Sequence, residues 1–249
     1  MAQKSSTTTL PRVSSSTTGS PSSVFSAKFA ARDPVKLVKR AREHVGRREW
    51  GKAVACYAEA FELAPTDDGE LWFEYAASQL LAEDRAGYRR TCAHVLARCQ
   101  ASKMRSYLAA RVCTLAPDSA DESELPGRLS QGELQGNKNE YWSLTEQAAL
   151  HVRAGRFQEA TPLLEVSLRI DGRPARAVLN WLWLALAYQK QGKTAEARRW
   201  LDKAANWLDQ QGGQMPLETH LMGAHRHNWL EAHVLRREAE ALIQPAEKR

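Results

Sequence analysis

From about residue 35 onward, large apolar side chains and alanines recur at the spacing of an α-helix. In the clearest segment, Trp50 is followed three residues later by Ala53, seven later by Tyr57 and ten later by Ala60. Offsets of three, seven and ten place side chains on one face of a helix. The small residues suit a close approach of two helices, and the large ones fill the space between them. The pattern therefore predicts a helix that begins at Trp50 and packs against a neighbour.

The same pattern returns along the chain, which indicates an internal repeat. Further copies begin at Tyr88, Phe157 and Thr194, and the copy at Tyr88 departs most from the pattern. The steps between the four anchors are 38, 69 and 37 residues, and 69 is about twice a period of roughly 34. Gly155 and Gly192 each stand two residues before an anchor, where a tight turn would join two helices. We expect antiparallel helix pairs, with one eroded unit between the second and third anchors.

The helix before the last anchor carries Trp181, Leu184, Ala185 and Tyr188, which follow the spacing W-x2-L-G-x2-Y with Ala in place of Gly. Together with the pattern of the second helix, this segment resembles the tetratricopeptide repeat (TPR). The phrases RRTCAHVLARC, VCTLAPD, WLDKAANWLD and LRREAEALI also resemble the helical arrays of planctomycete bacteria, which often follow Ser/Thr kinase or WD40 domains. The resemblance covers about residues 35–244. It implies an all-α, right-handed superhelical solenoid, in a chain that is a stand-alone relative of these proteins or a fragment of one.

The N-terminal segment differs in composition from the rest of the chain. Residues 5–26 contain fourteen Ser or Thr and little apolar surface to bury. We expect residues 1–32 to be a disordered linker or leader. The segment is also Ser-rich and poor in acids, so an organellar transit peptide is the alternative. It has no long apolar stretch of the kind found in secretory signals.

A second change of composition lies between the two halves of the repeat region. Residues 118–140 contain three Gly and one Pro, and residues 116–140 carry a net charge of −4. We expect an irregular acidic linker or eroded repeat here, between N-terminal TPR-like helices at 33–117 and a C-terminal pair at 141–210. The alternative is a strand-like or helical insert that folds back into the groove of a basic array as an internal pseudo-ligand.

The chain is expected to end in a capping helix. A loop at 211–227 precedes a helix at 228–244, for which Asn228 is a suitable N-cap. A helix of this kind would cover the apolar end of the stack. Its inward face is marked by Trp229, Ala232, Leu235, Ala239 and Leu242.

The charge favours no single class of partner. Lys and Arg number 35 against 29 Asp and Glu, which gives a net charge of +6, but there is no dense basic block of the kind found in nucleic-acid-binding arms. No apolar run is long enough to predict a transmembrane helix. A nucleic-acid-associated basic helical repeat remains the alternative because of eight Trp and several basic pairs. These pairs are Lys39–Arg40, Arg47–Arg48, Arg89–Arg90, Arg198–Arg199 and Arg236–Arg237.

No arrangement of polar residues predicts catalysis, a cofactor or a metal site. Four histidines cluster near the C-terminus at a spacing that matches no strong metal site: His220, His225, His227 and His233. The four cysteines contain no C-x-x-C and fit buried free thiols in a reducing cytoplasm: Cys56, Cys92, Cys99 and Cys113. We therefore predict a cytoplasmic protein that is not an enzyme.

The resemblance also implies where a ligand would bind. In tetratricopeptide arrays the first helix of each pair lines a concave groove that commonly receives a peptide. The pattern places eight candidates there: Arg42, Phe73, Trp142, Thr145, Arg153, Leu182, Leu186 and Lys190. The positions that carry Lys and Asn in the clamp for chaperone C-termini here hold Val38, Ala76, Thr145 and Leu182, which argues against a chaperone-tail adaptor.

An apolar surface flanked by Arg42, Arg153 and Lys190 would suit an amphipathic, acidic peptide. We predict a protein–protein interaction scaffold or regulatory module, and the family context implies signalling complexes that contain kinases. Alternatively, Leu179, Leu182 and Leu186 are simply covered by neighbouring helices or by the 118–140 segment.

Overall fold

The structure is a computed structural model that describes residues 33–101, 103–117, 119, 125–136, 140–211 and 226–244. These residues form α-helices joined by turns and contain no β-strand, so the all-α prediction is confirmed. The predicted tail at 1–32 and most of the predicted loop at 211–227 lie outside the described residues. None of the described helices is both long and apolar enough to cross a membrane.

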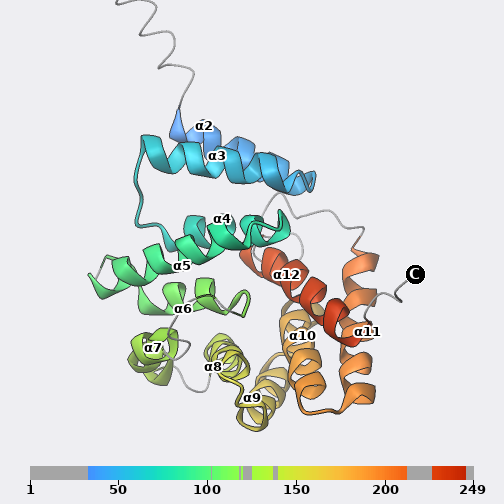
Figure 1. Ribbon diagram of the computed structural model, residues 1–249. Helices are drawn as coiled ribbons and strands as arrows, with labels where there is room; N and C mark the ends of the chain where they lie inside the picture. The colour runs from blue at the N-terminus through green and yellow to red at the C-terminus, as the bar shows by residue number, and fades with distance from the viewer. Residues whose placement is uncertain are drawn as a thin grey trace, which may run out of the picture. The chain divides into compact units, whose positions relative to one another are not determined.

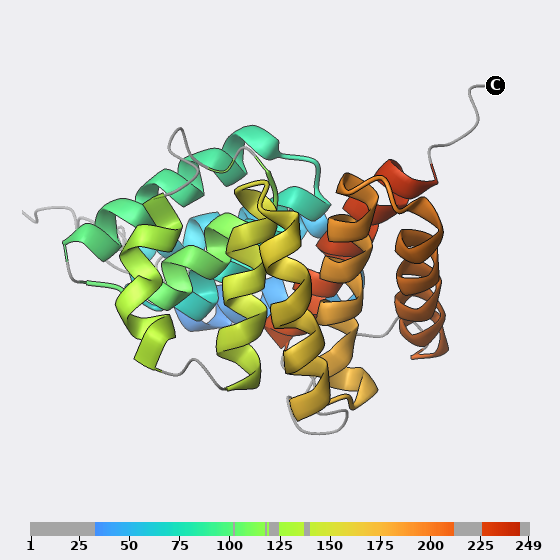
Figure 2. The same ribbon diagram turned by 90° about the horizontal axis from the view of Figure 1, so that it is seen from below.

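The helices follow one another in pairs along the chain (Figure 1). α2 packs on α3, α4 on α5, α6 on α7, α8 on α9, and α10 on α11. Figure 2 shows α7 to α10 in a row, in the order of the sequence. The bounds are α2 (Pro34–Gly46), α3 (Trp50–Leu63), α4 (Gly69–Leu81), α5 (Arg85–Gln100), α6 (Ser106–Thr114), α7 (Leu125–Gly136), α8 (Tyr141–Arg153), α9 (Phe157–Ile170), α10 (Pro174–Lys190), α11 (Thr194–Gln210) and α12 (Arg226–Ile243).

Three-residue turns join the helices of four pairs, and all four turns have the same backbone form. The middle residue lies in the left-handed region, with φ of 58° at Arg48, 65° at Glu83, 76° at Gly155 and 78° at Gly192. In each turn the next amide donates to the carbonyl five residues before it, at 2.8 to 2.9 Å, which closes the end of the first helix. The sequence predicts the two glycine turns. It does not predict Arg48 and Glu83, because residues other than glycine seldom adopt this backbone.

The left-handed residues locate the repeat more accurately than the apolar anchors do. They are spaced 35, 72 and 37 residues apart, so one irregular pair, α6 and α7, lies between the regular ones. α3, α9 and α11 begin at the predicted anchors Trp50, Phe157 and Thr194. α5 begins at Arg85, three residues before the predicted anchor Tyr88.

The segment predicted as irregular contains α7. Glu133 of α7 holds the start of α6, because its carboxylate accepts from the Tyr107 amide at 3.0 Å and from the Ser106 hydroxyl at 2.9 Å. The Ser143 hydroxyl of α8 donates to the Leu134 carbonyl at 2.8 Å. These contacts stabilise a helix that its three glycines disfavour. Over the described part of 118–140, α7 therefore packs between α6 and α8, which corrects the prediction of an irregular linker.

The buried apolar residues form two clusters, and α12 belongs to both. The first contains residues of α2 to α6, and the second contains residues of α8 to α11. α12 gives Trp229, Leu230 and Val234 to the first and Ala232, Leu235, Ala239 and Ile243 to the second. The predicted last helix is present, but it does not cap the end of the stack. It packs against α4, α10 and α11 and joins the two halves.

Candidate functional site

The first helices that the resemblance predicts to line an open groove are not all free, because α12 packs on α4 and α10. α12 lies between α4 and the α10–α11 pair (Figure 1). Phe73 of α4 is buried, and its ring contacts His227 of α12 edge-on, with 6.0 Å between the ring centroids. Thr145, Leu182 and Leu186 are buried as well. These predicted groove residues therefore do not offer an open surface, which corrects the prediction of an accessible groove along the whole array.

The first polar contact of α12 lies at its N-terminus. Glu74 of α4 accepts two bonds from Arg42, at 2.9 and 3.0 Å, and one from Arg226 of α12 at 3.4 Å. The Tyr57 hydroxyl donates to the same carboxylate at 2.5 Å, and burial raises the pKa of Tyr57 well above its usual value. Arg42, expected to face a peptide, instead helps to hold α2, α4 and α12 together.

A buried charge cluster fixes the next turn of α12. Arg111 of α6 pairs with Glu231, donates to the Asn228 side chain at 3.1 Å, and lies 3.7 Å from the carboxylate of Glu146 in α8. Asn228 is thus a buried acceptor inside α12 and not its N-cap. The guanidinium also lies 4.8 Å from the centre of the Phe73 ring. The cluster ties α4, α6, α8 and α12 at one point.

One cation cannot balance two carboxylates in this cluster. Arg111, Glu146 and Glu231 are each less than a tenth exposed. Burial raises the pKa of Glu146 to about 8, although Arg111 opposes that rise and the charge of Glu231 adds to it. Glu146 therefore retains a proton over much of the neutral range, and Arg111 with Glu231 forms the charged pair.

Arg153 makes the third attachment, near the middle of α12. Its guanidinium donates to both oxygens of Glu238, at 2.6 and 2.7 Å, and to the Thr114 and Leu115 carbonyls at 2.7 and 3.1 Å. It also lies 4.8 Å from the centre of the Trp183 ring. The sequence predicts that Arg153 faces a ligand, but its guanidinium is already hydrogen-bonded within the protein.

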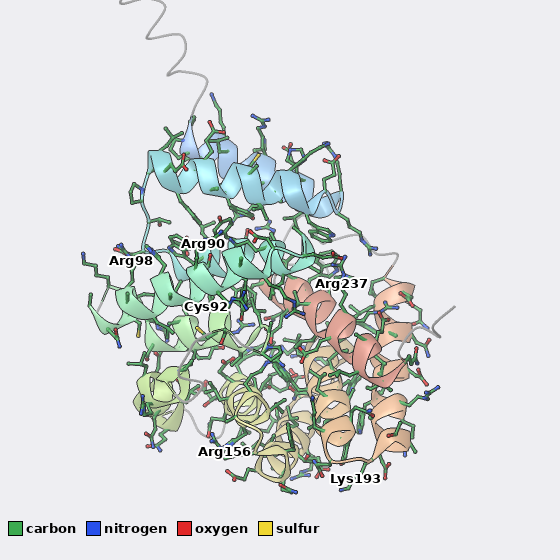
Figure 3. The ribbon with its side chains drawn as sticks, viewed as in Figure 1. Arg90, Cys92, Arg98, Arg156, Lys193 and Arg237 are labelled. Carbon is green, nitrogen blue, oxygen red and sulfur yellow. The ribbon has the colours of Figure 1, made fainter. Side chains whose placement is uncertain are left out.

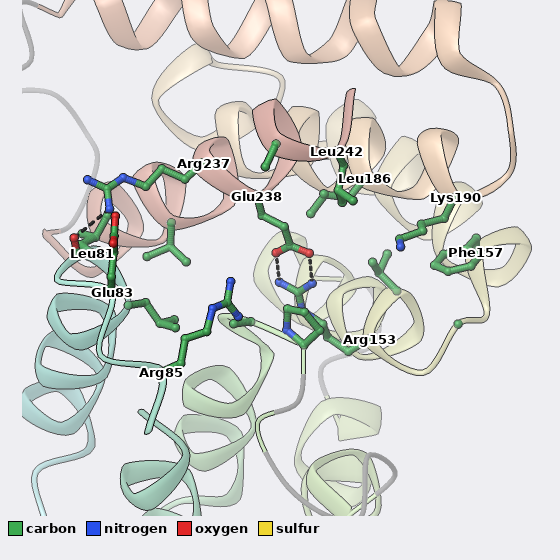
Figure 4. Close-up of a pocket in the computed structure, with 17 residues that line it drawn as sticks. Leu81, Glu83, Arg85, Arg153, Phe157, Leu186, Lys190, Arg237, Glu238 and Leu242 are labelled. Carbon is green, nitrogen blue, oxygen red and sulfur yellow. Dashed lines mark hydrogen bonds and ion pairs between the residues drawn. The ribbon is translucent and has the colours of Figure 1, made fainter. Parts of the chain in front are cut away.

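Beside the C-terminal half of α12 lies an open cavity of about 800 Å³, which we call the α12 cleft (Figure 4). Its walls are the α4–α5 turn, the α8–α9 turn, the end of α10 and α12 itself. Apolar side chains form most of the lining: Leu80, Leu81, Val152, Phe157, Leu186, Val234 and Leu242. An apolar hollow with a few polar groups at its edge is the usual form of a ligand site.

The charges at the cleft are mostly positive. Arg85 and Lys190 are exposed and have no acidic partner among the residues that the structure describes, and they reach the cavity from different sides (Figure 4). Arg237 of α12 donates to the Leu81 carbonyl at 2.8 Å, beside the end of α4 (Figure 3). Two acidic residues line the cleft, Glu83 and Glu238. Glu238 is paired with Arg153, so Glu83 is the acid in the lining whose charge Arg153 does not balance. The cleft therefore suits a ligand with apolar groups and negative charge.

The structure thus divides the eight predicted groove residues. Arg153, Leu186 and Lys190 line the α12 cleft, and Arg42 lines a second cavity beside α2. The remaining four, Phe73, Trp142, Thr145 and Leu182, line neither cavity. Trp142 is half-buried under Arg176, and the Thr145 hydroxyl donates to Asn180 at 2.8 Å in the core. Arg85 was missed, because nothing in the local sequence separates it from other exposed arginines.

The histidine and cysteine candidates form no metal-holding group in the described part of the chain. No group of three or more His, Cys, Asp or Glu there could hold a metal ion, and His220 and His225 lie outside the described residues. All four cysteines are free thiols. Cys56, Cys92 and Cys113 are buried, and a hydrogen bond with Cys92 together with burial raises the pKa of Cys113. The sequence matches no protein-family model and no curated protein.

His233 of α12 makes the stability depend on pH. Burial, together with the charges of Arg48, Arg236 and Arg237, lowers its pKa from 6.5 to about 4, and Asp209 only partly opposes this. The unfolded chain therefore binds a proton below pH 6.5 that the folded chain does not, and stability falls as the pH falls from 6.5 to about 4.

We expect His233→Phe, which keeps a ring against Trp229, to remove up to about 3 kcal/mol of this loss. The measurement is urea unfolding of both proteins at several pH values between about 4 and 7. Parallel stability curves for the two proteins over that range would show that His233 is not the group responsible.

Proposed function

We propose that this protein is an interaction module that binds an acidic, amphipathic segment of a partner protein in the α12 cleft. The observation that supports this is the pairing of an apolar lining with two exposed cations, Arg85 and Lys190, that have no acidic partner among the described residues. Apolar side chains of the segment would lie against the partly exposed Leu80, Phe157 and Leu242, and its carboxylates would pair with the two cations at the edge.

We also propose that the array is of the tetratricopeptide type, with α12 as an added helix in its groove. The four helix pairs joined by equivalent left-handed turns support this assignment. In such an array the cleft is the part of the groove that α12 leaves open. Signalling complexes that contain kinases are then the partner class to examine first.

The test begins with selection from a displayed library of random peptides of about 12 residues on the full chain. We expect the selected sequences to combine Asp or Glu with Leu, Ile or Phe. A synthetic peptide from this set should bind Arg85→Glu/Lys190→Glu at least about tenfold more weakly, since two favourable pairs become repulsive. The matched control is Arg198→Glu/Arg199→Glu, which makes the same charge change on the exposed face of α11 and should leave binding within about threefold.

Two results would count against the proposal. One is that no peptide can be selected, and the other is that both double variants bind the selected peptide equally. The nucleic-acid alternative makes a different prediction, because a labelled oligonucleotide would lose affinity in both variants and would bind with a steep salt dependence. One of its basic pairs is already used internally, since Arg236 binds Asp209 and Glu240 while Arg237 binds the Leu81 carbonyl.

A further inference from the structure

A second surface lies at the other end of the array, on the first helix. A cavity of about 620 Å³ is lined by α2, the end of α3, the connection to α4, the start of α4 and Arg226 of α12. We call this surface the α2 patch and define it by Val35, Val38, Lys39, Glu43, Phe61 and Leu71. Val35 is 77% exposed and Ile170 is 50% exposed, and among the described residues these are the two large apolar side chains that face solvent.

α2 has fewer packed neighbours than the helices inside the array. Its buried face, Leu37, Ala41 and Val45, recurs every four residues and lies against α3. α3 is the only described helix that packs extensively on α2, whereas α4 packs on α3, α5, α6 and α12. The face of α2 that carries Val35 and Lys39 therefore has no further helix against it in the described chain.

The patch carries an exposed apolar side chain, an apolar hollow and two opposite charges. Val35 projects from the surface next to a hollow whose walls include Phe61 and Leu71, so one copy could offer a projection to the hollow of another. Lys39 and Glu43 carry opposite charges, and neither has an ion-pair partner among the residues described. A surface that holds both members of an ion pair can form that pair twice across a two-fold axis.

We propose that a second copy of this chain docks on the α2 patch and forms a symmetric dimer. Val35 of each copy enters the apolar hollow of the other, and Lys39 of each copy pairs with Glu43 of the other. The surface is small and carries charge, so the dimer forms reversibly at micromolar concentrations. This inference is independent of peptide binding, because the α2 patch shares no lining residue with the α12 cleft.

The test is sedimentation equilibrium of the full chain from about 1 to about 200 µM, where mass action moves a weak dimer toward the monomer on dilution. We expect the mass to rise from that of a 27.9 kDa monomer to twice that value. Val35→Glu should weaken the dimer at least about tenfold, because it places a carboxylate in an apolar hollow. Ile170→Glu makes a similar change at the other exposed apolar side chain and should leave the association unchanged.

A charge exchange makes the test specific for the proposed pairing. Lys39→Glu should weaken the dimer, since the introduced carboxylate would then face Glu43 of the other copy. The double variant Lys39→Glu/Glu43→Lys restores opposite charges across the axis and should restore the dimer. Circular dichroism verifies that each variant is folded. A wild-type chain that stays monomeric over the whole range overturns the proposal, and so does a dimer that Val35→Glu leaves unchanged or that the double variant fails to restore.

Discussion

Arg111→Met is expected to lower the free energy of unfolding by about 3–5 kcal/mol. The substitution keeps an apolar chain of similar length but leaves Glu146 and Glu231 buried together without their cation. The loss should be smaller at about pH 5 than at about pH 8, because Glu146, whose pKa is about 8, is fully protonated at the lower pH and one buried carboxylate then lacks its cation instead of two. Urea unfolding at the two pH values measures both quantities.

The controls separate the buried cluster from ordinary ion pairs. Arg173 pairs with Asp171 at 2.7 Å, but its side chain is 72% exposed, so Arg173→Met should change the stability far less than Arg111→Met does. Adding Glu146→Gln and Glu231→Gln to Arg111→Met should recover much of the lost stability at about pH 8, since no buried charge then remains. If Arg111→Met is as stable as the wild type at both pH values, the buried cluster does not stabilise the fold and the prediction is wrong.

Trp229→Ala is expected to cost about 3–5 kcal/mol, because this indole is buried where α12 meets the first apolar cluster. Its ring lies against His233, with 4.0 Å between centroids. The comparison is Trp207→Ala on α11, where a half-buried indole packs at the margin of the second cluster and its removal should cost less. Thermal and urea unfolding of the two variants provide the measurement, and equal small losses would mean that α12 contributes little to the fold.

The regular helix pairs could be predicted because their signals are local. The helix starts at Trp50, Phe157 and Thr194 follow from periodic spacing, and Gly155 and Gly192 mark two of the turns. The start of α5 was misplaced because its turn has glutamate where the later turns have glycine. α7 was missed because its glycines disfavour a helix, while the contacts that stabilise it, such as those of Glu133, come from another part of the chain.

The place of α12 could not be predicted in this way. The sequence shows a helix with an apolar face, and Leu230, Val234 and Ile243 beside that face already indicate burial on more than one side. Which helices it contacts depends on pairs far apart in sequence, such as Arg111 with Glu231, separated by 120 residues. For the same reason, the positions assigned to the groove lie on the first helices, but the contacts of α12 with Phe73 and Arg153 could not be predicted.

The most direct test of this account is hydrogen exchange of the full chain, followed by mass spectrometry. If α12 is part of the core that joins both halves, its amides should be protected as strongly as those of α10 and should exchange only with global unfolding. Peptides from Arg226–Ile243 that exchange within seconds while α10 stays protected would contradict it. That result would mean that α12 leaves the groove readily and that the α12 cleft is not a stable feature of the protein.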